Sequence, residues 1–328
     1  MTRLILSSTH CFAPCGALLA SILFSTPFVA SPGGAAESRF VFDAAGRRVE
    51  IADTARIVSI GSSVTEVLYA LGLADRISGV DQTSTFPDAA GKKQNVGYMR
   101  TLSAEGVLSL APSLVLAIEG SGPPDVVEVL TKASVPFVLV PEAHDIDGVL
   151  RKIRFIANAV GMKAEGEKLA LAVREDFDAL AAIRAKIATR RKALFVLAIG
   201  GGAPIVGGRD SSAAAIFALA GAENAFDRIT GYKPASDEAA LAAEPDAIVV
   251  MAERGHAITA ETVFALPAFA ATPAAKTKRL IALPGLYLLG FGPRIPHAAR
   301  DLAAKLYPEL QIPALPARPW TGPGDGAQ

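Results

Sequence analysis

Short apolar runs of strand length alternate with segments of helical periodicity along most of the chain. Seven runs are rich in β-branched residues and end at a polar or Gly/Pro loop: RIVSIG, RISGVD, SLVLAI, PFVLVP, ALFVLAIG, DAIVVMA and RLIALP. Segments with helical spacing lie near residues 65–71, 103–110, 125–132, 211–220, 236–243 and 298–306. Strands that alternate with helices predict parallel sheets, so we expect two β/α series.

One long segment separates the two series. Residues 146–191 carry helix-period apolar positions and dense charge, and they contain no proline. Because this run is far longer than the mean helix of about 12 residues, we expect one helix that spans both lobes, with Gly161 as the place where it would bend. The predicted fold class is α/β: two β/α lobes with mainly parallel sheets, at residues 37–145 and 192–310, joined by this long helix.

The two ends of the chain have different patterns. Residues 1–36 contain one early arginine, an apolar stretch near residues 16–30 and small residues just before position 37, which is typical of a cleavable secretory signal. That stretch is short for a membrane span, and no later stretch is long enough. Residues 311–328 are rich in proline and glycine, which predicts a flexible tail. We therefore expect a periplasmic protein that is not embedded in the membrane, and a monomer.

Composition excludes several classes of function. Lys+Arg and Asp+Glu both number 32, so no broad basic field favours a nucleic-acid partner. Both cysteines, Cys11 and Cys15, lie within the predicted signal, so the mature chain would have no disulfide and no Cys-ligated metal. A small-molecule ligand is the better expectation.

We expect that ligand to bind between the lobes. In open α/β sheets, ligands bind outside the carboxyl ends of the strands. The loops at those ends are residues 61–65, 81–101, 119–124 and 142–145 of the first lobe, and 200–212, 224–234, 253–258 and 283–294 of the second.

An enzyme is the weaker hypothesis. The glycines at 200–202 follow a strand, as phosphate-binding turns do, but GGGAP lacks the G-x-G-x-x-G spacing and Pro204 interrupts the helix that should follow. The sequence shows no Ser-His-Asp order, no HxxxH pair and no carboxylate dyad. We therefore expect no catalytic residues and no catalytic cofactor.

Four motifs, in order along the chain, carry a family resemblance. RIVSIGSSVTEVLYALG, NVGYMRTLSAEGVLSLAPSLVLA, GYKPASDEAALAAEPDAIVVMA and LLGFGPR resemble the periplasmic haemin-binding proteins of bacterial haem importers (HmuT type). The resemblance runs from about residue 40 to 308. These proteins belong to the class III periplasmic binding proteins, with a chelatase-like fold, whose other members carry siderophores and cobalamin. A siderophore or a corrinoid is therefore the alternative ligand.

The resemblance implies that Tyr98, in the G-Y-x-R stretch, is the axial ligand of haem iron. A phenolate oxygen is a hard donor suited to ferric iron, and Arg100, two residues along, would help the phenol to ionise. Met99 would lie against the porphyrin or simply fill a gap. Arg100 and Arg209 would pair with propionates or remain solvated arginines, and Tyr232 would face the cleft or serve only as a turn residue.

Histidine is the rival ligand type. His144 and His256 fall on predicted cleft loops, whereas we expect His297 on the surface of a C-terminal helix. Some relatives have a histidine where this chain has Ile199. The iron would then be five-coordinate or use His256 or a water molecule, and the haem stoichiometry stays open as well.

The resemblance also implies protein partners. Haem would be delivered to an ABC permease, downstream of an outer-membrane haem receptor. In this family each lobe presents a carboxylate on its outer edge to arginines of the permease. By motif these carboxylates are Glu66 and Glu238. Both lie near the start of a predicted helix, where an acidic residue also complements the helix dipole.

Overall fold

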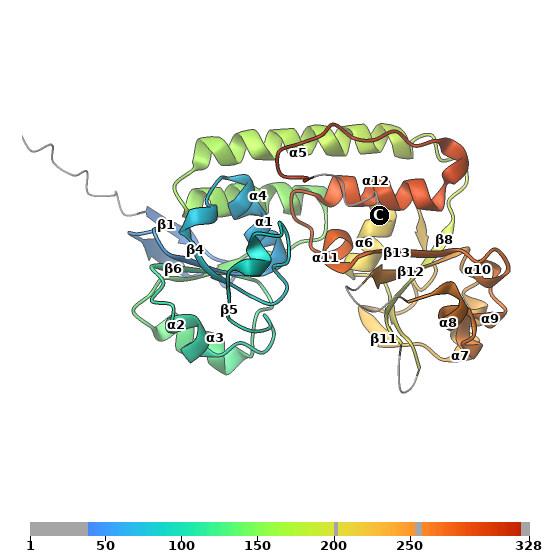
Figure 1. Cartoon of the computed structure of the whole chain (residues 1–328), viewed down its shortest axis with the longest axis horizontal. Helices are drawn as coiled ribbons and strands as arrows, with labels where there is room; N and C mark the ends of the chain where they lie inside the picture. Colours follow the sequence, from blue (N-terminus) through green and yellow to red (C-terminus); the bar gives the residue numbers. More distant parts are fainter. Residues whose placement is uncertain (1–38, 200–202, 253–257, 323–328) are drawn as a thin grey trace, which may run out of the picture. The chain divides into compact units, whose positions relative to one another are not determined.

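The computed structural model describes residues 39–199, 203–252 and 258–322. Its first lobe is built on a parallel sheet with the strand order β5-β4-β3-β6-β7 (Figure 1). The strands are β3 (Ile57–Ile60), β4 (Ile77–Val80), β5 (Gln94–Asn95), β6 (Leu114–Ile118) and β7 (Phe137–Val140). β3 and β6 are buried along their whole length, as expected for strands covered on both faces.

Helices and a hairpin complete the first lobe. They are β1 (Arg39–Phe42), β2 (Arg48–Ile51), α1 (Ser62–Ala70), η1 (Ala74–Arg76), η2 (Ala90–Lys92), α2 (Ala104–Leu108) and α3 (Pro124–Lys132). β1 and β2 pair antiparallel. Gly61 makes the turn from β3 into α1 at a φ of 106°, and a Cβ atom there would collide with the Ile118 side chain. The tight turn holds α1 against the sheet.

The second lobe has a mixed sheet. Its order is β11-β9-β8-β12-β13, with β10 also paired to β8. The strands are β8 (Lys192–Ala198), β9 (Ile205–Gly207), β10 (Glu223–Asn224), β11 (Tyr232–Pro234), β12 (Ala247–Ala252) and β13 (Leu280–Pro284). β10, β12 and β13 belong to the parallel part, whereas β9 and β11 run antiparallel at one edge. The predicted mainly parallel α/β architecture is confirmed.

The helices of the second lobe surround this sheet. They are α6 (Ser212–Leu219), α7 (Asp237–Ala242), α8 (Ala260–Phe264), α9 (Pro267–Ala270), α10 (Pro273–Lys276), α11 (Gly285–Leu289), α12 (Ile295–Leu306) and η3 (Pro308–Leu310). α6, α11 and α12 contact one another, and α12 also contacts β13. The main apolar core runs from the first sheet through the helices of the linking segment to the second sheet.

The linking segment differs from the prediction of one long helix. It forms two helices, α4 (Ile146–Ala159) and α5 (Lys163–Arg184), which pack against each other. The chain reverses at Gly161, whose φ is 78°; Gly161 N donates to Asn158 O, and Met162 N donates to Ala157 O. This pair of bonds is a Schellman motif, which ends a helix and turns the chain. α4 therefore packs on the first lobe, and α5 alone contacts both α4 and the second-lobe helices α6 and α12.

The predicted flexible tail also needs correction. Residues 311–322 are held against the helices, because Arg318 bonds to Asp176 on α5 and both Ile312 and Trp320 pack on the main core. Residues 323–328, like the predicted signal at 1–36, lie outside the described residues. In the described part of the chain, no helix is both long and apolar enough to cross a membrane.

Candidate functional site

Tyr98 lies in the loop after β5, and that loop is firmly held. Gly97 O accepts a hydrogen bond from Gln82 N at 2.8 Å, and Met99 O accepts one from Gly122 N at 2.9 Å. The Asn95 side chain accepts a further bond from Gly97 N at 2.7 Å. The Tyr98 side chain nevertheless remains 39% exposed. A fixed backbone with an exposed ring suits a residue that presents its hydroxyl to a ligand.

Arg100 connects this loop to the second lobe. Its side chain is exposed, and its positive charge acts to lower the pKa of Tyr232 on β11. The loop of the first lobe therefore faces the edge strand of the second. Of the predicted site residues, Tyr98 and Arg100 share this loop, and Arg100 lies near enough to Tyr232 for its charge to act on that residue.

Tyr232 is engaged within its own lobe. Its hydroxyl lies 2.8 Å from Ser212 Oγ and accepts a bond from Ala213 N at 3.3 Å. Burial raises the pKa of Tyr232 above its usual value, and the hydrogen bonds and the Arg100 charge only partly oppose this. The neutral phenol of Tyr232 is thus favoured, and its hydroxyl is already hydrogen-bonded within its own lobe.

Three other predicted residues have different placements. Met99 is half-buried and packs on two apolar clusters, so it fills a gap. Arg209 is exposed, with long contacts of 3.4 and 3.3 Å from its Nη1 to the carbonyls of Asp227 and Arg228, and its Nε lies 3.9 Å from Asp210 Oδ2. His256 lies outside the described residues.

The remaining histidines lie in packed surroundings. The His144 ring packs edge-on against Phe291 with 4.9 Å between centroids, and burial lowers the pKa of His144. His297 is buried, with its Nε2 atom 3.4 Å from Asp176 Oδ2, so the expected surface position is wrong. Among the described residues, no group of three His, Cys, Asp or Glu side chains could hold a metal.

Glu66 is not on an outer edge, in contrast to the expectation. Its side chain is buried and binds Arg294 through two bonds, Nε to Oε2 at 3.1 Å and Nη2 to Oε1 at 2.7 Å. The Arg294 guanidinium also lies 3.3 Å from the centroid of the Phe86 ring. Glu66 therefore joins the two lobes, and it presents no free carboxylate to a partner.

A second buried cation, Lys152, lies at the same contact between the two lobes. Lys152 on α4 donates to Glu142 Oε1 at 2.6 Å, to Ser63 Oγ at 3.3 Å and to Phe291 O at 3.2 Å. One short segment of the second lobe, residues 291–294, thus supplies Arg294 as the partner of Glu66 and the Phe291 carbonyl as a partner of Lys152. Phe291 adopts a φ of 48°, a strained value for a bulky residue, and it does so while its carbonyl faces Lys152.

Glu238 has the exposed position that was expected of both docking carboxylates. It lies in the first turn of α7, where its own backbone N–H and the Ser236 hydroxyl lower its pKa. The first lobe has a counterpart that the sequence reasoning missed. Glu105 is exposed in the first turn of α2, two residues after the capping residue Ser103, just as Glu238 follows Ser236.

The sequence did contain a signal for Glu105. Each Ser-x-Glu is followed, nine residues after the serine, by a proline that lies two residues before a central strand. The prolines are Pro112 before β6 and Pro245 before β12. The two helices therefore occupy matching places in the two lobes.

Family comparison agrees with this two-lobed architecture. The model of the family described as "Periplasmic binding protein" matches residues 57–287. The chain belongs to this family. Its α/β fold matches solved structures of class III periplasmic binding proteins.

Two solved structures are similar over most of the chain. The periplasmic haem-binding protein BhuT, in complex with two haems, is 38% identical with a TM-score of 0.73, covering 78% of this chain and 98% of that one. The haem-binding protein RhuT from Roseiflexus sp. RS-1, in apo form, is 36% identical with a TM-score of 0.74, covering 79% and 100%.

Curated relatives are more distant. The uncharacterized ABC transporter substrate-binding lipoprotein YvrC of Bacillus subtilis is 29% identical over 77% of this chain and 80% of its own length. A vitamin B12-binding protein of Vibrio parahaemolyticus is 25% identical over 59% of this chain and 69% of its own.

Proposed function

We propose that this protein captures haem between its lobes in the periplasm and delivers it to an ABC permease. The observation that carries the proposal is the exposed Tyr98 ring on a loop that is fixed by hydrogen bonds and also carries Arg100, whose charge acts on Tyr232 of the second lobe. The similarity to two haem-binding structures supports haem, and the named relatives support a binding role rather than a catalytic one.

Tyr98 supplies the oxygen that holds ferric iron. A phenolate is a hard donor, and tyrosine is among the known protein ligands of haem. Arg100 lies two residues along and is exposed, so its guanidinium can pair with a propionate. Arg209 offers a second guanidinium from the other lobe.

The substitution Tyr98→Phe tests the iron ligand. It keeps the ring and removes the oxygen donor, so haem affinity should fall at least about tenfold, or ~1.4 kcal/mol, and the tyrosinate charge-transfer bands should disappear. Haemin titration followed by absorption spectroscopy measures both. Tyr69→Phe is the matched control, because the buried Tyr69 hydroxyl has no hydrogen-bond partner among the described residues. An unchanged spectrum in Tyr98→Phe would refute the assignment.

A corrinoid is the second candidate ligand, and the B12-binding relatives favour it. The same titration distinguishes the two ligands when cobalamin replaces haemin. Tight cobalamin binding that Tyr98→Phe leaves unchanged, together with weak haem binding, would replace haem by a corrinoid on the same scaffold.

Delivery requires a surface that docks on the permease. We place it at the outer helices that carry Glu105 and Glu238, one in each lobe. Both carboxylates are exposed, and a serine cap holds each helix start. Because its carboxylate already binds Arg294, Glu66 is left out of this surface.

A further inference from the structure

The chain returns along the linking helix after the last helix of the second lobe. Beyond α12 and η3 it runs beside α5, where Arg318 makes its contacts (Figure 1). Arg318 donates to Asp176 Oδ1 from Nη2 at 2.8 Å and from Nε at 3.0 Å, and also to Glu175 Oε2 and to Ala172 O. Asp176 is fully buried, so this bond is a charged anchor within the packed helices.

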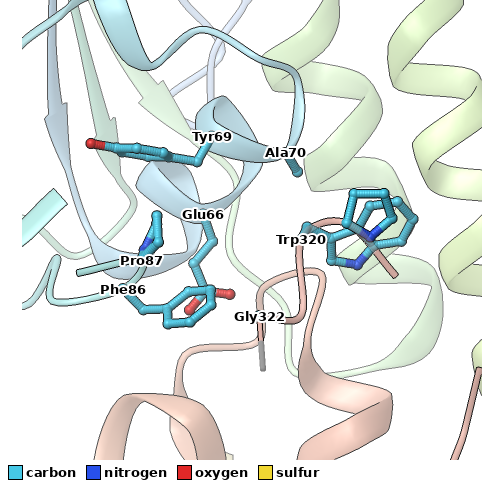
Figure 2. Close-up of a pocket in the computed structure, with 8 residues that line it drawn as sticks. Glu66, Tyr69, Ala70, Phe86, Pro87, Trp320 and Gly322 are labelled. Atoms are coloured by element: carbon cyan, nitrogen blue, oxygen red, sulfur yellow. The ribbon is translucent and has the colours of Figure 1, made fainter. Parts of the chain in front are cut away.

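Past this anchor, the chain reaches the first lobe. Trp320 and Gly322 line a cavity of about 200 Å³ whose other wall is formed by the first lobe (Figure 2). The first-lobe residues in that wall are Glu66, Tyr69, Ala70, Phe86 and Pro87. A Cβ atom on Gly322 would lie 3.3 Å from the Phe86 ring, the same ring that carries the Arg294 guanidinium. The tail thus packs beside the contact between the lobes that Glu66, Phe86 and Arg294 form.

Few interactions attach this segment to the two lobes. Among the described residues, no backbone hydrogen bond joins residues 311–320 to either lobe, as expected for a proline-rich stretch. Its polar attachment rests on Arg318, with apolar contacts from Ile312, Leu315 and Trp320. The buried Nε1 of Trp320 has no hydrogen-bond partner among the described residues, and Trp320 borders the cavity rather than packing directly on the first lobe there. This attachment stabilises the segment less than one in which the side chains are fully packed and every buried polar group is hydrogen-bonded.

We propose that residues 312–322 form a strap between the lobes, fastened at Arg318, and that its release widens the range of lobe positions and speeds loss of the ligand. The part of the proposal about the ligand rests on the proposed function; the part about the lobes does not. When the strap is fastened, it holds α5 through Arg318 and reaches the Phe86 turn of the first lobe through Trp320 and Gly322. When it is released, the lobes stay joined by α5 and by residues 291–294, without the added contact from the tail.

Fluorescence tests the fastening directly, because Trp320 is the only tryptophan of the chain. In Arg318→Ala the emission should shift to longer wavelength and acrylamide quenching should increase. Adding Asp176→Asn to this variant replaces the buried carboxylate, left with only the 3.4 Å contact to His297, by a neutral amide, so the melting temperature should recover in part while Trp320 stays exposed. Arg154→Ala is the matched control, since Arg154 makes a similar two-bond pair with Glu167 that does not involve Arg318 or Asp176. Unchanged emission in Arg318→Ala would overturn the fastening role.

Distance measurements test the lobes without any ligand. Spin labels go on exposed positions, Val129→Cys in α3 and Lys276→Cys in α10, in the full chain with Cys11 and Cys15 replaced by serine. Double electron–electron resonance should give a broader distance distribution in Trp320→Ala and Arg318→Ala than in the parent, and the parent width in Arg154→Ala. Haem should then leave the first two variants several-fold faster.

The outcomes separate the two proposals. Parent-like distributions in both strap variants would overturn the strap, whatever the protein binds. Broadened distributions in a protein that does not bind haem would retain the strap and overturn the haem assignment. Broadened distributions with an unchanged haem dissociation rate would overturn the link to ligand loss.

Discussion

At the scale of single residues, Lys152 is the most unusual charge in the molecule. It is 1% exposed, and burial lowers its pKa despite the opposing effects of the Glu142 and Glu66 charges. Removing one member of a buried pair leaves the other without its partner, which costs about 3–5 kcal/mol. Because Glu142 is partly exposed and can be hydrated, Lys152→Met should fall near the lower end of that range. Urea unfolding followed by circular dichroism measures the loss.

The same position predicts a pH dependence. A lowered pKa means that the unfolded chain binds more protons than the folded one at alkaline pH, so the parent should gain stability relative to Lys152→Met as the pH rises toward 10.5. Adding Glu142→Gln to Lys152→Met should cost less than the sum of the single changes. A flat difference between parent and variant across the alkaline range would contradict a depressed pKa.

Residue-level prediction from the sequence succeeds only where the signal is local. The G-Y-x-R loop could be placed after a strand because the surrounding strand and helix patterns are strong, although Tyr98 as a ligand remains a prediction. Glu66 was misplaced because its partner Arg294 is 228 positions away in the sequence, and no local pattern records that contact. Both the buried ion pair and the buried His297 depend on tertiary packing.

At the scale of elements, the seven predicted strands all appear, because buried β-branched runs between turn residues have few alternatives. The sequence reasoning missed six short strands of two to four residues, none of which lies in such a run: β1, β2, β5, β9, β10 and β11. The single linking helix was wrong because helical periodicity continues through the reversal. The glycine at the turn was the available signal, and its role depends on α4 and α5 packing together.

Gly166 tests that packing. It lies in the interior of α5, where helix propensity alone predicts that alanine would stabilise by about 1 kcal/mol. In the structure, however, a Cβ atom at Gly166 would sit closer to the Ala157 methyl on α4 than real contacts allow. Gly166→Ala should therefore destabilise, by about 1–3 kcal/mol as for other overpacked sites. The swapped pair Gly166→Ala with Ala157→Gly should recover most of the loss in thermal unfolding, and a stabilised Gly166→Ala would refute the close contact.

At the scale of the whole molecule, the two lobes repeat one plan without close sequence identity. Each has a serine-capped helix with an exposed glutamate, then a proline and a central strand. The lobe architecture followed from the order of elements, whereas the strap and the contact between the lobes could not be predicted, because they join residues from opposite ends of the chain. The binding of a partner that contacts both lobes through these helices would depend on the relative placement of the two lobes.

The last prediction concerns that partner. In Glu105→Ala and Glu238→Ala, the haem titration should match the parent, since both side chains are exposed and neither is among the proposed haem contacts, and thermal stability should fall only slightly. Stimulation of ATP hydrolysis by the reconstituted cognate permease should be weakened in each variant and lost in the double variant, because each carboxylate supplies charge to one half of the docking surface. Glu128→Ala is the control, as Glu128 is an exposed carboxylate of α3 paired only with its neighbour Lys132. Full stimulation by the double variant would remove these carboxylates from the docking surface, whereas equal loss in the control would indicate a general charge effect.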